Sequence, residues 1–327
     1  MKDIANYCKV STATVSLALN DSNLVNRETK QHIQAASDDL GYIPNEIARS
    51  LVKKRSYRIG VIVPDILNSF YATFVTDLNR YAEAANYSLS IYISNNSSEQ
   101  EKHIVDELIR NRVEGVIIVP INEETSPPQY ITRLTTSGIP FLFAVDRYEN
   151  IDSTYVISDY TEGMIQIVEH LIECGYQDIA YLNGDLSVYS LKLRRDGYIK
   201  ALEHVGLASQ LIDVDTVDYN GACKAITRCI SEGRLHRAFV CPNDMMALGV
   251  INTLYQNGIL VPEHCAVTGF DNVIFSEIAP VSITTVKQDI PTIAQKCLDL
   301  ILSSIHKNNI KSEAHLIRTS LIIRNSC

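Results

Sequence analysis

Residues 2–20 read KDIANYCKVSTATVSLALN, and this stretch decides the fold class of the N-terminal part of the chain. It predicts a first helix over Asp3–Cys8, a break at Lys9, and a second helix over Thr12–Leu19 that Ser11 is placed to cap. Two short helices joined by a turn of three or four residues form the helix-turn-helix arrangement. The apolar side chains of both helices are spaced to form a miniature core.

The residues that follow, as far as position 51, also have helical periodicity and no strand pattern. Asn26 is placed to cap a third helix, and Gly41 ends it where glycine is most common. Residues 42–44, Tyr-Ile-Pro, are predicted to be extended because proline disfavours helix in the residue before it. Asn45 can cap a fourth, short helix over Glu46–Leu51. The N-terminal part is therefore predicted to be all-α.

The second helix presents side chains that suit a phosphate backbone. Hydroxyl groups stand at positions 11, 12, 14 and 16, and hydroxyls commonly bond phosphate oxygens. Two short helices with a polar face are also common as caps on larger domains. On these residues alone, DNA binding and a helical cap are equal alternatives.

From Arg58 onward, short apolar runs alternate with longer helical stretches. Continuous Val/Ile runs, without apolar/polar alternation, indicate strands buried on both faces of a parallel sheet. Repeated β-α units of this kind give doubly wound sheets covered by helices. The predicted strands are Ile59–Val63, Leu89–Ile93, Val116–Val119, Phe141–Val145, Tyr155–Ile157, Ile179–Leu182, Ala238–Cys241 and Ala266–Gly269.

Residues 58–327 are too many for one ordinary sheet, so two α/β lobes are predicted, with a join near Ser158. A late return between the lobes is also expected. Val281–Val286 is predicted to be a crossing segment, Ile290–Ile305 a helix and Leu316–Arg324 a last strand. The predicted fold class is thus an all-α helix-turn-helix domain followed by two doubly wound parallel sheets.

Six stretches in this order resemble the lactose-repressor/galactose-repressor (LacI/GalR) family of bacterial transcriptional regulators. The resemblance begins in KDIANYCKVSTATVSLALN, VNRETKQHIQAASDDLGYIPNEIARSL and RIGVIVPDILNSFY. It continues in DYTEGMIQIVEHLIECGYQDIAYLNGD, NDMMALGVINTLYQNGILVPEHCAVTGFDN and SITTVKQDI, and so covers nearly the whole chain. It implies a two-lobed domain like that of periplasmic binding proteins, and a repressor whose DNA affinity is set allosterically by a small molecule.

The resemblance also implies domain boundaries. Residues 1–44 are expected to form the DNA-binding domain and residues 45–57 the hinge helix and linker. Residues 58–327 are expected to bind the effector and to dimerise. Within them the N-lobe spans about 58–157 plus the late return, and the C-lobe about 158–284 plus the C-terminal strand.

By the same resemblance, the second helix of the pair contacts bases and phosphates. The residues on its base-reading face are Thr12, Ala13 and Leu17. Those at phosphate-holding positions are Ser11, Thr14, Ser16 and Asn20. Leu17 stands where the family commonly has an arginine that reads guanine, and leucine can only touch a thymine methyl. This departure leaves the operator sequence open.

YIPNEIARSL, residues 42–51, matches the family's hinge helix, which forms on the operator. Leu51 matches the leucine that enters the minor groove, and Asn45 and Ala48 lie on the same helix. An apolar wedge unstacks a base step and bends the duplex toward the protein. A six-residue helix is unstable alone, so its folding can be coupled to docking. Plain core packing is the alternative role for Leu51 and for Leu17.

Two further departures from the family concern the first helix. Lys9 replaces the usual turn glycine, so a positive φ there would cost roughly 1 kcal/mol. The first helix also begins two or three residues closer to Met1 than is usual in the family. It therefore lacks the threonine that usually caps it. These departures bear on DNA affinity and leave the binding class unchanged.

A cleft between two α/β lobes, at the carboxyl ends of the strands, is a natural small-molecule site. Polar residues follow several predicted strands, as in Asp146-Arg147, Asn243-Asp244 and Asp271-Asn272. Each of these alone would more simply be a helix cap or loop residue, and Asp244 in particular is placed to cap a helix over Met245–Gln256. The resemblance assigns effector contacts to Phe70, Tyr71, Asp146, Arg194, Asn243 and Asp271.

Carboxylate and amide pairs suit sugar hydroxyls, and an aromatic ring suits the apolar face of a sugar. A sugar or sugar phosphate is therefore the expected effector. The chain has no tryptophan, the residue that most often stacks on sugars, so a nucleobase-like effector stays open.

An enzyme and a secreted receptor are the competing classes. No G-x-G-x-x-G, Walker loop, G-x-S-x-G or H-E-x-x-H motif occurs, so catalysis is not expected. The eight cysteines are scattered without CxxC or Cys/His spacing, which predicts reduced thiols and no metal site or cofactor. A periplasmic sugar receptor would need a signal peptide and would lack Met1–Leu51.

The net charge of −9 is divided unevenly along the chain. Residues 1–55 hold eight Lys/Arg against six Asp/Glu, for +2, and the other 272 residues hold 21 against 32, for −11. A basic cluster, Lys53-Lys54-Arg55 with Arg58, marks the junction. No apolar run is long enough to span a membrane and no signal peptide precedes the first helix, so a cytoplasmic protein is expected. A homodimer on a pseudo-palindromic double-stranded operator is expected, without a tetramer-forming tail.

Overall fold

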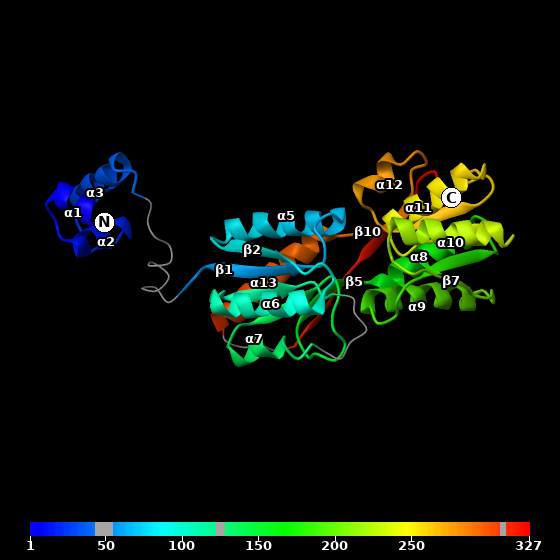
Figure 1. The fold of residues 1–327 in the computed structure, drawn as a ribbon, viewed down its shortest axis with the longest axis horizontal. Coiled ribbons are helices and arrows are strands. Elements are labelled where there is room, and N and C mark those ends of the chain that lie inside the picture. The colour runs from blue at the N-terminus through cyan, green and yellow to red at the C-terminus, as the bar shows by residue number, and fades with distance from the viewer. Residues whose placement is uncertain (43–54, 122–127, 308–311) are drawn as a thin grey trace. The chain divides into compact units, whose positions relative to one another are not determined.

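The computed structural model describes residues 1–42, 55–121, 128–307 and 312–327. These residues form two compact units, Met1–Ser56 and Tyr57–Cys327, which are described separately below (Figure 1). The hinge helix predicted over Glu46–Leu51, with Asn45, Ala48 and Leu51, lies outside the described residues.

The described part of the N-terminal unit contains the three helices predicted for it: α1 (Lys2–Cys8), α2 (Thr12–Leu19) and α3 (Arg27–Asp39). The predicted caps are confirmed. Ser11 accepts a hydrogen bond from the Thr14 amide at 3.0 Å, and Asn26 accepts one from the Thr29 amide at 2.8 Å. These bonds satisfy amides that the first turn of each helix leaves without an internal partner.

A small apolar core holds the three helices together. Ile4, Val15 and Ile33, one from each helix, are almost fully buried in it. Lys9, in the turn between α1 and α2, has the positive φ expected at this position, 56°. The turn therefore keeps a left-handed residue although the side chain is lysine, and so bears the conformational cost that glycine would avoid.

In the second unit, the first sheet belongs to the N-lobe. Its order is β11-β5-β4-β3-β1-β2, and every neighbouring pair is parallel. Helices α5 (Ser69–Ala84) and α13 (Ile290–Lys307) cover one face, and α6 (Ser98–Arg110) and α7 (Thr132–Thr136) cover the other. The strands are β1 (Arg58–Val63), β2 (Ser88–Ile93), β3 (Gly115–Ile118), β4 (Phe141–Ala144), β5 (Tyr155–Ser158) and β11 (Ala314–Ile317).

The second sheet belongs to the C-lobe and has the order β12-β10-β9-β8-β6-β7. Its pairs are parallel except β10–β12. Helices α10 (Tyr219–Ser231) and α11 (Asp244–Gln256) cover one face, and α8 (Tyr160–Glu173) and α9 (Tyr189–His204) the other. The strands are β6 (Ile179–Asn183), β7 (Gln210–Asp213), β8 (Ala238–Val240), β9 (Ala266–Asp271), β10 (Thr284–Gln288) and β12 (Thr319–Ile322); the short helix α12 (Ile274–Ile278) follows β9.

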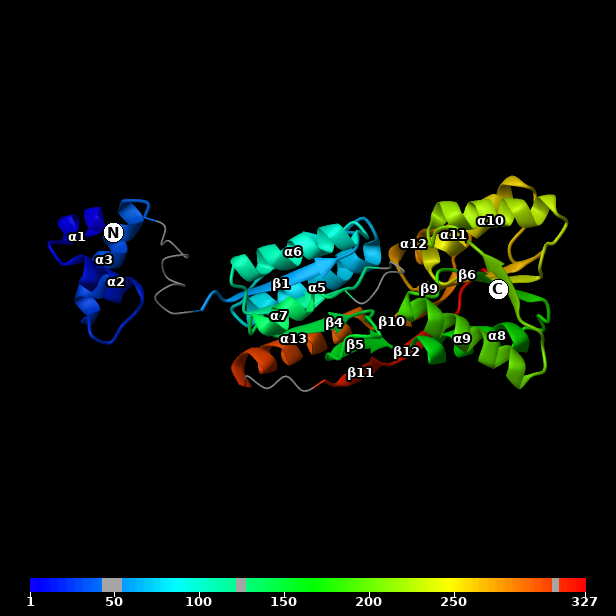
Figure 2. The same ribbon diagram turned by 60° about the horizontal axis from the view of Figure 1, so that its bottom comes forward.

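The chain passes between the lobes where β5 leads to α8, where β10 leads to α13, and where β11 leads to β12 (Figure 2). The join predicted near Ser158 lies at the first of these. The single last strand predicted over Leu316–Arg324 is wrong. β11 and β12 are separated by Arg318, and each completes a different sheet, because the chain changes lobe at that residue.

Candidate functional site

Helix α2 carries the residues to which DNA contacts were assigned, and three of them form an exposed face. Thr12, Ala13 and Leu17 are all exposed, with 37% of the Leu17 surface accessible. Leu17 is thus available for contact and is not a core residue of the described unit. Ser16 is half-buried.

The polar residues of this helix also stabilise the helix itself. The hydroxyls of Ser11 and Thr14 share a hydrogen bond of 2.9 Å, and the Asn20 amide donates to the Ser16 carbonyl at 2.8 Å. Each of these side chains would have to keep or exchange a local bond in order to hold a phosphate.

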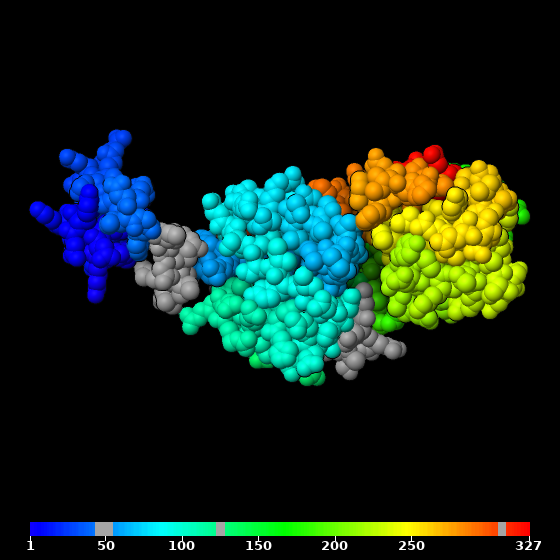
Figure 3. Space-filling model, turned by 45° about the horizontal axis from the view of Figure 1, so that its top comes forward, coloured from blue at the N-terminus to red at the C-terminus, as the bar shows by residue number. Residues whose placement is uncertain are grey.

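The second unit contains a cavity of about 980 Å³ between its two lobes. In the space-filling view the N-lobe (cyan) and the C-lobe (green to orange) meet along a furrow (Figure 3). The lining residues follow β1 and β4 in the N-lobe and β6, β7, β8 and β9 in the C-lobe. Carboxyl ends of parallel strands from both sheets therefore converge on one cleft, as the strand pattern predicts. Phe70, Tyr71, Asp146, Arg194, Asn243 and Asp271 all line it.

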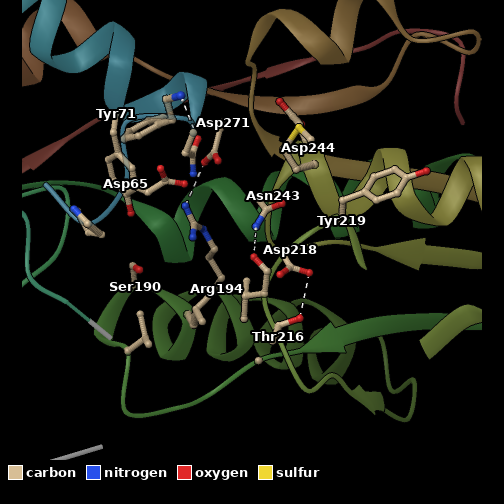
Figure 4. A pocket seen from close by; sticks show the side chains of 18 of the residues that line it. Asp65, Tyr71, Ser190, Arg194, Thr216, Asp218, Tyr219, Asn243, Asp244 and Asp271 are labelled. Atoms are coloured by element: carbon tan, nitrogen blue, oxygen red, sulfur yellow. Dashed lines mark hydrogen bonds and ion pairs between the residues drawn. The ribbon is translucent and has the colours of Figure 1, made fainter. Parts of the chain in front are cut away.

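Arg194 and Asp271 form the charged centre of the cleft (Figure 4). The Arg194 Nη2 atom donates to Asp271 Oδ1 at 3.2 Å, and its guanidinium lies 4.4 Å and 4.5 Å from the ring centroids of Tyr160 and Phe270. Only 7% of Arg194 is exposed, and its Nε atom has no hydrogen-bond partner among the described residues. Contact with both rings restrains the orientation of this cation, and its Nε atom is buried without a bond to offset its desolvation.

Burial raises the pKa of Asp271 to about 6, although Arg194 and a hydrogen bond from Gln288 both lower it. The Gln288 Nε2 atom donates to Asp271 Oδ1 at 2.6 Å, and the Ser158 hydroxyl donates to Gln288 Oε1 at 2.6 Å. Ser158 and Gln288 belong to two of the crossings between the lobes. A hydrogen-bonded chain thus joins the central carboxylate to the hinge.

Asp146 makes its contacts across the cleft. Its carboxylate accepts hydrogen bonds from the Ser190 hydroxyl at 2.6 Å and the Ser190 amide at 3.3 Å, as well as from the Arg147 amide at 2.7 Å. Ser190 is in the first turn of α9, whose own N-cap residue, Val188, supplies no side-chain bond. An N-lobe carboxylate therefore caps a C-lobe helix. Burial raises the pKa of Asp146.

The helix pattern suggests Asp244 as the cap of α11, but the cap is its neighbour Asn243. Asn243 caps α11, accepting from the Met246 amide at 2.8 Å, so the predicted cap at Asp244 is wrong. Asp244 is fully buried, accepts from the Thr285 hydroxyl at 2.6 Å and the Val273 amide at 2.8 Å, and has a pKa well above its ordinary value because of burial. Gly269 makes room for it, because a Cβ there would lie 2.2 Å from Asp244 Oδ1.

The two N-lobe aromatics differ in how much surface they offer to a ligand. Phe70 is only 3% exposed and belongs to the N-lobe core, whereas Tyr71 is half-buried. Their rings meet edge to face at 5.6 Å. Tyr71, labelled in Figure 4, is therefore the more exposed of the two aromatic side chains that line the cavity.

Several lining residues were missed by reasoning from the sequence. They are Asn183 and Asp185 after β6, Asp213, Asp215 and Asp218 after β7, and Gln288 at the end of β10. The first two follow a predicted strand, so their position at a strand end was a usable signal. The next three follow a strand that was not predicted, because the Gln210–Asp213 sequence, QLID, is short and mostly exposed.

The described residues contain no group of three His, Cys, Asp or Glu side chains able to hold a metal ion. Within the same residues, no helix is both long and apolar enough to cross a bilayer.

Comparison with known proteins matches both parts of the chain. Residues 1–45 match the model of the bacterial regulatory proteins of the lacI family, and residues 168–327 match a periplasmic binding protein-like domain. The chain is 28% identical to the transcriptional repressor PurR of Glaesserella parasuis, over 94% of this chain and 91% of that protein. It is also 28% identical to catabolite control protein A of Priestia megaterium, over 95% and 93%.

A solved structure gives the same result for the fold. The lac repressor dimer bound to operator and the anti-inducer ONPF is 28% identical, covers 99% of this chain and 97% of its own, and has a TM-score of 0.88. Two of these similar proteins, PurR and the lac repressor, are repressors by name. Helix-turn-helix unit, two-lobed domain and chain order all agree: this chain belongs to the lacI family of bacterial regulatory proteins and is a transcriptional regulator.

Proposed function

We propose that this chain is a cytoplasmic homodimeric repressor that binds a pseudo-palindromic operator and responds to a small carbohydrate held between its lobes. Residues 1–44 would read DNA, residues 45–57 would form the hinge and linker, and residues 58–327 would bind the effector and dimerise. No catalytic step is part of this proposal, and two of the proteins reported above, PurR and the lac repressor, are repressors by name.

One observation carries the effector part of the proposal: Arg194 and Asp271 form a buried pair at the centre of a cleft lined by both lobes. An arginine donor, a carboxylate acceptor and a tyrosine ring are the groups with which proteins bind sugar hydroxyls and ring faces. Because Asp271 is bonded to Gln288 and through it to Ser158, a ligand that engages Asp271 also acts on the crossings between the lobes.

The regulatory consequence follows from linkage. A ligand changes operator affinity only if it binds the two lobe arrangements with different affinity, and a tenfold change needs about 1.4 kcal/mol of coupling. The lobes are joined by short crossings, so their relative angle is the natural quantity for the ligand to change.

The experiment is an operator assay on the full chain. Sites are selected from random double-stranded DNA, and fluorescence anisotropy then measures operator affinity with and without each sugar in a panel. We expect a pseudo-palindromic site, an affinity that falls steeply with salt, and a change of tenfold or more on adding the effector.

Two variants separate the sites. Asp271→Ala should abolish the effector response and keep operator binding, and an unchanged response removes Asp271 from the site. Leu51→Ala should weaken operator binding and keep effector binding, and equal operator affinity removes the proposed minor-groove wedge. Selection of no DNA site at all would contradict the regulatory proposal.

A further inference from the structure

The charge of the cleft narrows the class of effector. Among the described residues that line it are eight aspartates and one arginine, and no lysine, histidine or glutamate. The aspartates are Asp65, Asp146, Asp185, Asp213, Asp215, Asp218, Asp244 and Asp271. If the buried Asp146 and Asp244, whose pKa values are raised, are counted as neutral, six aspartates still face one arginine.

The one cation of the lining does not offset this charge for a ligand. Arg194 already pairs with Asp271 at 3.2 Å, contacts the rings of Tyr160 and Phe270, and is only 7% exposed. Arg228 donates to the main-chain oxygen of Asp213 at 2.8 Å, and Arg324 bonds Asn272, but neither side chain lines the cavity. A phosphate or carboxylate entering the cleft would meet repulsion without a counter-charge of its own.

The cleft also offers a ligand more hydrogen-bond acceptors than donors. Six polar side chains of the described lining already donate within the protein, whereas carboxylate oxygens are acceptors only. The donors in use are Thr216 to Asp218, Asn183 to Asp213, Ser190 to Asp146, Gln288 to Asp271, Asn243 to the Val217 carbonyl and Tyr160 to the Val145 carbonyl. The cleft therefore favours ligands that bring hydrogen-bond donors. Hydroxyl and ammonium groups have such donors, and phosphates lack them.

The helix N-termini at the cleft are also occupied. A free helix N-terminus is an anion site, because its first amides lack partners. Here Asn68 caps α5, Asp146 caps α9, Asp218 caps α10 and Asn243 caps α11. Two of the four caps are themselves carboxylates, so these helix ends add no attraction for an anion.

We propose that this cleft binds a polyhydroxylated effector that carries no negative charge, prefers an amino sugar to its neutral parent, and excludes sugar phosphates and sugar acids. That the bound molecule is an effector rests on the proposed function, whereas the charge preference rests on the cleft alone. The exposed aspartates after β6 and β7, namely Asp185, Asp213, Asp215 and Asp218, form its acidic rim.

The first test measures the charge of the cleft without any effector. Thr216 is exposed on the rim, and Thr216→Cys in the full chain places a thiol there. Its rates of reaction with a trimethylammonium-bearing and a sulfonate-bearing methanethiosulfonate reagent are compared by peptide mass spectrometry. Cys174, which is exposed and does not line the cavity, is the reference thiol in the same molecule.

We expect the cation-to-anion rate ratio at the introduced thiol to exceed that at Cys174 by at least about tenfold. Adding Asp213→Asn, Asp215→Asn and Asp218→Asn should reduce the excess, because asparagine keeps the acceptor oxygens and the α10 cap without the charge. Equal ratios at the two thiols would overturn the inference and leave the proposed function standing.

The second test uses matched ligands. Glucose, galactose and mannose are each titrated calorimetrically as the parent sugar, the 2-amino sugar, the 6-phosphate and the uronic acid. In any series that binds, we expect the two anionic members to bind at least about tenfold more weakly than the parent. Equal or tighter binding of an anionic member refutes the inference. If no series binds while the thiol ratio is high, the carbohydrate proposal fails and the charge inference stands.

Discussion

At the residue scale, Asp271 combines a central place in the cleft with an unfavourable backbone conformation. It ends β9 with a φ of 104°, which side-chain-bearing residues rarely adopt, and its side chain is only 12% exposed. Such strain persists where neighbouring bonds hold it, here those from Arg194 and Gln288. Val145, a β-branched residue beside Asp146, also has a positive φ, 68°. Both residues line the cleft, so these two unfavourable backbone conformations are concentrated there.

The raised pKa of Asp271 makes its contribution to stability depend on pH. Its folded value of about 6 exceeds the ordinary 3.8, so the folded protein holds this proton more tightly, and the stabilisation is lost as pH rises through about 6. We expect the unfolding free energy of the wild type to rise by about 1.4 kcal/mol, relative to Asp271→Asn, when pH falls from 7.5 to 5. Urea titrations of both proteins at each pH measure this, and parallel profiles would contradict it.

Leu17 carries a prediction about base recognition. It is exposed on α2 and cannot make the bidentate contact with guanine that arginine makes. Leu17→Arg should add a preference for a G·C pair at one position of each half-site, by about 1–3 kcal/mol. Parallel site selection with wild type and variant checks this, with Leu17→Ala as a control that should gain no such preference. An unchanged site would mean that Leu17 faces no base.

At the scale of elements, four helices that begin at the cleft, α5, α9, α10 and α11, are each capped by a polar side chain that also lines the cleft. Asn243 shows the overlap, because its oxygen caps α11 while its amide donates to Val217 at 3.4 Å in the loop after β7. A residue of this kind stabilises the lobe and lines the cavity at once, so mutating it changes both the stability of the lobe and the cavity wall.

Substitutions at Asn243 can separate the two roles. Asn243→Ala should lower the unfolding free energy by about 1 kcal/mol through loss of the cap, whereas Asn243→Ser keeps a capping oxygen and should cost a few tenths. Calorimetry on the same proteins measures the effector dissociation constant. If Asn243 contacts the ligand, both variants bind it weakly; if it only caps, the serine variant binds normally.

The strands also show which parts of the fold can be predicted from the sequence alone. Strands rich in Val and Ile, such as β1 and β3, were predictable because burial on both faces leaves a continuous apolar run. β7 has no such run, because it lies at a sheet edge and is exposed, and the acidic residues that follow it were missed with it. The split of Leu316–Arg324 into β11 and β12 depends on pairing partners from two distant segments, which local pattern does not encode.

The candidate site was predictable to a similar depth. Position after a strand, with family resemblance, led to Arg194, Asn243 and Asp271, all of which line the cleft. That Asp146 caps a helix of the other lobe was not readable, because the contact spans 44 positions and depends on how the lobes meet.

At the scale of the whole effector-binding unit, contacts across the cleft hold the lobes together. Asp146 bonds Ser190, and nearby Glu149 pairs with Lys192 at 3.2 Å. The first contact is buried and the second partly exposed, so the first should dominate.

Ser190→Ala should therefore shift the effector-free protein toward a more open arrangement. The buried carboxylate of Asp146 would lose its shortest hydrogen bond, at a cost of about 1–3 kcal/mol. Small-angle X-ray scattering of the full chain should show a larger radius of gyration than in the wild type. Lys192→Ala removes only the partly exposed pair and should leave the scattering nearly unchanged; equal profiles for all three proteins would show that the Ser190 contact does not hold the lobes.

The late return of the chain to the N-lobe has a consequence for biosynthesis. β1 leaves the ribosome early, but α13, which covers one face of its sheet, and β11, which pairs with β5, follow only after the C-lobe residues 159–288 have been made. At ordinary translation rates this delay is on the order of 10 s. For that time the part of this sheet face that α13 later covers stays exposed in the nascent N-lobe, and apolar surface of this kind is what chaperones shield.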